Sequence, residues 1–160
     1  MIYFQTSLLV MLFFLLTIAT RQSREKSLQI RNVIADSITK ISFSSFGGRS
    51  GRFESLDISS DSIIYVQGSY ESEKSIREKT VRSLWNSLKN EINIRDFDKI
   101  QSNPGHAQFD GVDITLCIEK GKEKHSVVNG HEDTLNYKRI KAFTNILEKE
   151  LFGLRKKMKW

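Results

Sequence analysis

Cysteine is almost absent from this sequence, which removes several classes of protein at once. Cys117 is the one cysteine among 160 residues, so no internal disulfide can form and a disulfide-stapled scaffold is excluded. A lipoprotein signal does not fit either, because such signals end on a cysteine at the cleavage point. Apolar and polar residues alternate around Cys117, which predicts a position in mid-strand, on the face opposite Ile114 and Leu116. We expect a buried, unreactive thiol there.

Metal-ligand and catalytic spacings are missing as well. No two of the three histidines, His106, His125 and His131, have the i, i+4 spacing of a helical zinc site. The run His131-Glu132-Asp133 is explained by turn and cap chemistry, and Asp110-Gly111-Val112-Asp113 does not match a calcium loop. We therefore expect no metal, no cofactor and no catalytic residues.

Charge is lacking from the first twenty residues. Met1 to Thr20 contains no Asp, Glu, Lys or Arg, and residues 8–16 are an unbroken apolar run. The small residues Thr17 and Ala19 suit cleavage before Thr20, as in a signal peptide, although the usual basic start is absent. Residues 2–19 are also just long enough for a retained membrane anchor.

Three topologies follow from this N-terminal segment. The segment is a cleaved signal, an uncleaved anchor for an exported domain, or an inverted anchor that holds the domain inside. Arg21, Arg24 and Lys26 follow the segment and favour the inverted anchor, because positive flanks tend to stay in the cytoplasm. Our expectation is a protein exported to the periplasm or secreted, or anchored by residues 2–19.

The remaining residues are enough for one domain. Residues 21–37 are predicted to be a polar linker, residues 38–153 an α+β domain and residues 154–160 a basic tail. The formal net charge of +6 comes largely from that tail. We interpret the tail as a solvated, frayed segment after the last helix, or else as a contact for an anionic membrane surface. The residues concerned are Arg155, Lys156, Lys157, Lys159 and Trp160.

Alternation and helical periodicity predict the elements of this domain. Residues 68–79 are charged and poorly patterned and are expected to form a loop. Thr80 suits the N-cap of a helix that extends to about residue 92, Asp133 or Thr134 suits the start of a final helix, and Gly153 suits its C-cap. The strands are expected at about residues 41–44, 55–59, 63–66, 112–118 and 122–128. The predicted fold is an antiparallel sheet of about five strands with two helices on one face, in the order βββαββα.

The segment Gly47-Gly48-Arg49-Ser50-Gly51 is the most unusual local element. It does not match a phosphate-binding loop, which has a different glycine spacing and opens a helix. Strands flank it on both sides, so it is either a flexible hairpin connection or a projecting recognition loop. In the second interpretation the binding residues are Gly47, Gly48, Arg49, Gly51 and Arg52.

The same elements carry a family resemblance. A Gly-Gly-x-x-Gly loop, a central helix, an aspartate-led strand pair and a closing helix follow one another over about residues 39–152. This order resembles small exported bacterial proteins of unknown function and is similar to the emfourins, protein inhibitors of thermolysin-like metallopeptidases. The loops here are longer than in emfourins, so no inhibitory residue is carried over. The matching segments read Phe46-Gly47-Gly48-Arg49-Ser50-Gly51, Leu84-Trp85-Asn86-Ser87-Leu88, Phe97-Asp98-Lys99-Ile100 and Asp110-Gly111.

These observations lead to three functional hypotheses. The first is a non-catalytic binding module for a protein partner, which the resemblance narrows to a peptidase inhibitor. The second is a membrane-peripheral envelope protein that uses the basic tail. The third is a small exported hydrolase, which requires Asp110 or Asp113 to meet a histidine, such as His131, in one pocket. We expect no nucleic-acid partner.

Overall fold

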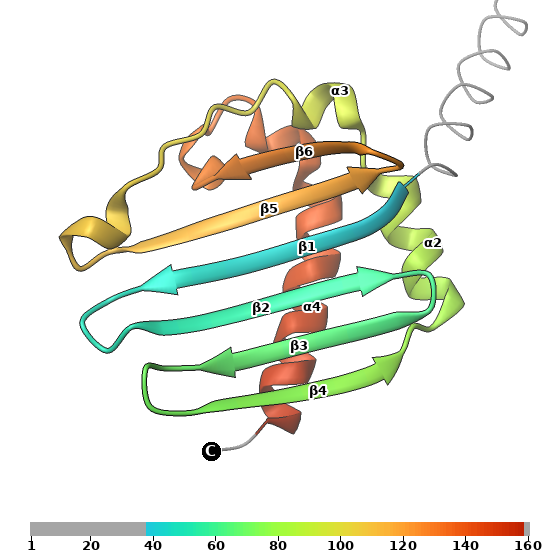
Figure 1. Cartoon of the computed structure of the whole chain (residues 1–160). Helices are drawn as coiled ribbons and strands as arrows, with labels where there is room; N and C mark the ends of the chain where they lie inside the picture. Colours follow the sequence, from blue (N-terminus) through green and yellow to red (C-terminus); the bar gives the residue numbers. More distant parts are fainter. Residues whose placement is uncertain (1–37, 159–160) are drawn as a thin grey trace, which may run out of the picture. The chain divides into compact units, whose positions relative to one another are not determined.

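Six antiparallel strands form the sheet of this protein, for which a computed structural model describes residues 38–158 (Figure 1). The order in the sheet is β4-β3-β2-β1-β5-β6, so β1 is central and β4 and β6 are the edges. The predicted α+β class is confirmed, and the predicted count of about five strands is wrong by one. The strands are β1 (Ile38–Gly47), β2 (Arg52–Ser59), β3 (Ser62–Gly68), β4 (Glu73–Lys79), β5 (Val112–Lys120) and β6 (Glu123–Val128).

The additional strand, β4, lies within the segment predicted to be a loop. Five of its seven residues are charged, and Ile76 is its one apolar side chain. It pairs with β3 along its whole length, from Ser62 opposite Lys79 to Gly68 opposite Glu73. Because β4 is an edge strand with mostly exposed side chains, burial imposes no alternation on its sequence, and the periodicity signal is lost.

Two longer helices cover one face of the sheet (Figure 1). They are α2 (Arg82–Glu91) and α4 (Lys141–Lys157), and the short helix α3 (Ile94–Phe97) follows α2. Three short 3-10 turns complete the fold: η1 (His106–Phe109), η2 (Gly130–Glu132) and η3 (Tyr137–Ile140). None of the helices within residues 38–158 is long and apolar enough to cross a membrane.

Three predicted helix boundaries are wrong. The N-cap of α2 is Val81, and the Thr80 hydroxyl is buried without a hydrogen-bond partner in the described part of the chain. Asp133 lies ahead of η3, and its carboxylate accepts a hydrogen bond from the Asn136 backbone N–H at 3.0 Å. Helix α4 begins only at Lys141, after η3. Gly153 lies inside α4 because the buried stripe continues past it through Leu154 to Met158.

The core lies between the sheet and the helices. Ile41 of β1 has Ile58 of β2 and Ile118 of β5 as direct neighbours, and all three side chains are at most 1% exposed. Helix α4 contributes a stripe of side chains at helical spacing to this core. The buried apolar residues of α4 are Phe143, Leu147, Leu151 and Leu154.

Cys117 lies on the opposite face of the sheet, as predicted, because its neighbours Leu116 and Ile118 point toward the helices. Its residue is 6% exposed, and burial raises the pKa of the thiol. The thiol therefore stays protonated at neutral pH, which agrees with the expectation of an unreactive cysteine.

The N-terminal segment predicted as a signal or anchor and the linker at 21–37 lie outside the described residues, as do Lys159 and Trp160.

Candidate functional site

The β1–β2 connection is a turn that hydrogen bonds hold in place. Gly47 and Arg52 are the last paired residues of the two strands. The backbone is left-handed at Gly47 (φ 143°), Gly48 (φ 73°) and Gly51 (φ 55°), a conformation that glycine adopts without steric cost. The N–H of Gly48 donates to the carbonyl of Gly111 at 2.9 Å, which ties the turn to the start of β5. The connection between the two strands is therefore tied to a neighbouring segment by a hydrogen bond.

Two of the predicted binding residues, Arg49 and Gly51, contact neighbouring segments. The Arg49 Nε lies 3.2 Å from Asp110 Oδ2, and both side chains are largely exposed. Gly51 is buried beneath the ring of Tyr70, and a Cβ at Gly51 would lie 2.0 Å from that ring. The β1–β2 turn therefore contacts both the β3–β4 turn and the segment that precedes β5.

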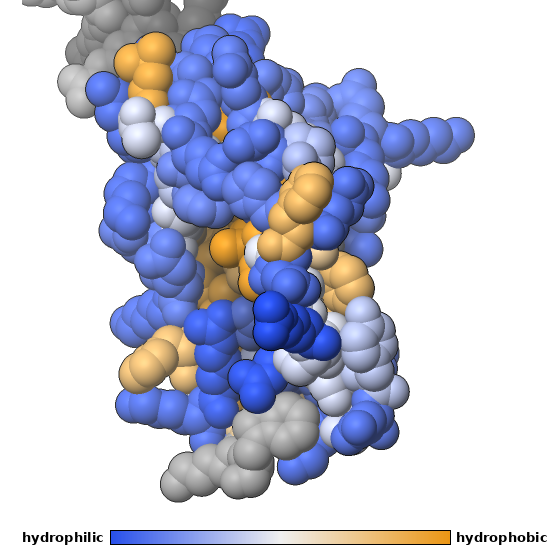
Figure 2. All heavy atoms as spheres, turned by 90° about the vertical axis from the view of Figure 1, so that its left-hand side faces the viewer, coloured by the Kyte–Doolittle hydropathy of each residue, from blue (hydrophilic) through white to orange (hydrophobic). Residues whose placement is uncertain are grey.

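A cavity of about 660 Å³ lies beside the turn, at the end of the sheet that these three connections share. Figure 2 faces this end of the sheet and shows a hollow there. Phe53 and Val112 are the apolar side chains in the cavity lining, and the other lining residues are polar, charged or glycine. Three of the five predicted binding residues, Gly47, Gly48 and Arg52, line it, whereas Arg49 and Gly51 do not. Glu54 of β2, Gln67 of β3 and Arg155 of α4 also line it, and sequence analysis missed these residues as part of the site.

Glu54 forms a hydrogen-bonded centre in the wall of the cavity. Its Oε1 accepts from Ser45 Oγ at 3.4 Å and from Arg155 Nη2. Its Oε2 accepts from Tyr65 Oη at 2.9 Å and from Arg155 Nε at 3.0 Å. The Glu54 side chain is only 12% exposed, so this arrangement supplies a partly buried carboxylate with the donors it requires.

The environment of Glu54 also fixes the charge state of its partners. Burial and the hydrogen bond to Glu54 raise the pKa of Tyr65 to about 12. The same carboxylate, through its hydrogen bonds, raises the pKa of Arg155. With both pKa values raised, Tyr65 is a neutral phenol and Arg155 a guanidinium cation at neutral pH.

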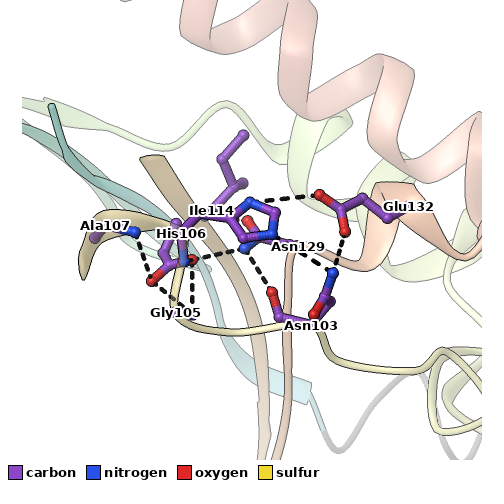
Figure 3. Close-up of polar contacts among 8 residues, drawn as sticks. Asn103, Gly105, His106, Ala107, Ile114, Asn129 and Glu132 are labelled. Atoms are coloured by element: carbon purple, nitrogen blue, oxygen red, sulfur yellow. Dashed lines mark hydrogen bonds and ion pairs between the residues drawn. The ribbon is translucent and has the colours of Figure 1, made fainter. Parts of the chain in front are cut away.

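A second polar cluster lies at the start of β5, around Asp113 (Figure 3). The Asp113 carboxylate accepts from the backbone N–H groups of Gly105 (3.2 Å) and His106 (3.0 Å) and from Asn129 Nδ2 (2.7 Å). Burial alone would raise the pKa of Asp113, but these hydrogen bonds outweigh it and lower the pKa.

Asn129 completes that cluster. It is fully buried, has a left-handed backbone (φ 51°), and its Nδ2 also donates to the Asn103 carbonyl at 2.8 Å. The Asn129-Gly130 pair signals a turn in the sequence, but nothing in the sequence reveals that the side chain links two distant segments. The cluster holds the chain around residues 103–107 against β5.

The residues required by the hydrolase hypothesis do not converge. Asp110 pairs with Arg49, and the ring of the exposed His131 packs edge-on against Tyr137 with the centroids 6.5 Å apart. The histidine nearest to Asp113 is His106, which contacts it through the backbone, while its ring lies 3.5 Å from Glu132. Among the described residues, no group of three or more His, Cys, Asp or Glu side chains is placed to hold a metal.

The basic residues at the C-terminus belong to α4 as far as Lys157. Arg155 binds Glu54, and Lys157 Nζ lies 2.7 Å from Glu78 Oε2. Lys156 Nζ lies 4.3 Å from the centroid of the Phe152 ring. The prediction of a tail after the last helix is therefore wrong for residues 154–157, which form the last turn of α4. Buried Leu154 and two acidic partners hold this turn against the sheet, although the side chains of residues 155–157 are exposed.

Comparison of the sequence with models of known protein families and with curated proteins finds no match.

Proposed function

We propose that this protein is a non-catalytic binding module, exported or tethered to a membrane, that binds a protein partner through one end of its sheet. This surface, the loop end, consists of the turns at residues 48–51 and 69–72 and the segment 104–111. The observation that carries the proposal is the cavity at this end, bordered by a turn whose shape three left-handed glycines define. Rigid elements that present such turns are typical of binding sites.

The side chains of the loop end suit a protein partner. Tyr70 and Phe109 of the loop end are 77% and 85% exposed, and the largely exposed Arg49 belongs to the same surface. Exposed aromatic residues beside arginines are characteristic of the central residues of protein interfaces. The remaining chemistry supports binding rather than catalysis, since Glu54 and Asp113, the acids with the most donors, are fully engaged in structural hydrogen bonds.

Capture of the partner by the full-length chain, in detergent and from the native host, tests this function. Arg49→Glu reverses the charge of a largely exposed side chain and should abolish capture with little loss of stability. Lys122→Glu, in the β5–β6 turn at the other end of the sheet, is the matched control and should leave capture unchanged. Equal capture by both variants would contradict the role of the loop end.

The finer assignment, an inhibitor of a thermolysin-like metallopeptidase, is supported by the resemblance to the emfourins. The chain should then slow peptide hydrolysis by thermolysin in proportion to its concentration, and Arg49→Glu should weaken that inhibition. An uninhibited enzyme would remove the inhibitor assignment and leave the binding module in place.

A further inference from the structure

The cavity beside the β1–β2 turn carries an excess of positive charge. Arg52 and Arg155 are the cationic side chains in its lining, and Glu54 is the acidic one. Arg52 is exposed and lies at the first residue of β2. Half of the Arg155 side chain, 48%, is exposed although it is bound to Glu54. The lining therefore has two guanidinium groups for one carboxylate.

Glu54 cannot serve as the binding partner of a positively charged ligand group. An ionised carboxylate has about four lone-pair sites, and Glu54 uses all four for Ser45 Oγ, Tyr65 Oη, and Nε and Nη2 of Arg155. A ligand ammonium group would have to displace one of these donors. A ligand carboxylate meets no such obstacle, because it can accept from Arg52 directly.

The position of the cavity identifies the source of that carboxylate. Gly47 and Gly48 belong to the β1–β2 connection and also line the cavity. The cavity therefore opens at the loop end. A partner that contacts the β1–β2 turn, whose Gly48 and Ser50 line the cavity, would lie at this opening. Phe53 and Val112 in the lining favour a segment that combines apolar side chains with its acidic group.

We propose that the cavity receives an acidic side chain on an apolar segment of the protein partner, with Arg52 as its direct contact and Arg155, oriented by Glu54, as the second cation. This inference rests on the proposed function of the loop end. Charge-assisted bonds between arginine and carboxylate then determine which partners bind, and the association should weaken as salt is added.

Two matched peptide pools test this preference on the full-length chain held in detergent micelles. Both are N-acetylated, C-amidated heptapeptides with five randomised apolar positions. The acidic pool has Asp or Glu at the other two positions, and the amide pool has Asn or Gln. We expect at least tenfold greater retention of the acidic pool, loss of that preference in Arg52→Gln, and its preservation in Arg52→Lys. The control Lys122→Gln should behave as the unmodified chain.

Equal retention of the two pools, or an unchanged acidic preference in Arg52→Gln, would overturn this inference. Arg52→Lys guards against an effect of folding, because it keeps the charge at the same position of β2. The result is separable from the function test. If Arg49→Glu abolishes partner capture while the two peptide pools are retained equally, the loop end binds the partner and the cavity does not discriminate between acidic and amide side chains.

Discussion

At the scale of single residues, Tyr65 shows how a core side chain supports the site. Its residue is fully buried, yet its hydroxyl reaches Glu54. Tyr65→Phe keeps the ring and removes one of the four donors to Glu54. Because a partly buried acceptor then loses a partner, we expect the free energy of unfolding to fall by about 1–2 kcal/mol. Denaturant titration measures this change, and Tyr70→Phe, at an exposed ring, is the control without effect.

The same residue predicts a pH dependence. The pKa of Tyr65 is about 12 in the folded protein and close to 10 in an unfolded chain. Between these values the unfolded state binds fewer protons than the folded state, so the stability that this group contributes is complete below pH 10 and is lost as the pH rises toward 12. In absorbance titration, a phenol that ionises near pH 12 should be lost in Tyr65→Phe, while Tyr137, whose pKa burial also raises, remains. If Tyr65→Phe instead loses a phenol that ionises near pH 10, the burial of this hydroxyl is contradicted.

At the scale of elements, the β1–β2 turn depends on two glycines in different ways. A Cβ at Gly47 would lie 2.2 Å from the Gly111 carbonyl oxygen, whereas a Cβ at Gly48 would meet nothing within 4 Å. Gly48→Ala should therefore cost only the left-handed strain, about 1 kcal/mol. Gly47→Ala adds a clash with backbone, and we expect a loss above 3 kcal/mol. Thermal unfolding of the two variants makes the comparison, and equal losses would show that β5 moves to accommodate the side chain.

Prediction from sequence succeeded where burial leaves a periodic pattern in an element. The alternation from Val112 to Ile118 predicts β5, and the stripe from Val81 to Ile92 predicts α2 to within two residues. Hydrophobic periodicity does not predict β4, because exposed side chains need not alternate. It also misplaces the end of α4, because Gly153 looks like a C-cap although buried Leu154 and Met158 continue the helix.

The candidate site is predictable only in part, for a related reason. Gly47, Gly48 and Arg52 stand in a conspicuous local motif. Glu54 and Arg155 are 101 positions apart in the chain, and each reads as an ordinary surface charge until the sheet and α4 bring them together. Long-range pairing of this kind leaves no trace in local composition.

At the scale of the whole molecule, the charge of +6 supports the alternative of a membrane-peripheral protein. Among the described residues of this predicted contact, Arg155 and Lys157 are paired with Glu54 and Glu78 whereas Lys156 lies over an aromatic ring. Of these three, Lys156 is therefore the one that this alternative leaves for the membrane. At about 1 kcal/mol per basic residue near an anionic surface, Lys156→Gln should weaken binding about fivefold and Lys157→Gln by less. Vesicles with increasing phosphatidylserine content separate this effect from insertion of the N-terminal segment. If vesicle binding changes neither with the two substitutions nor with the phosphatidylserine content, the membrane-peripheral alternative is excluded.

The charged composition of β4 has a consequence beyond hiding that strand from prediction. An edge strand presents unpaired backbone donors and acceptors that another chain can extend, and a long apolar edge would seed fibrils. Glu73, Lys74 and Arg77 place ionic groups of both signs along this border. A second copy arriving in extended form would have to remove water from these charged groups, so pairing of two copies through β4 is disfavoured.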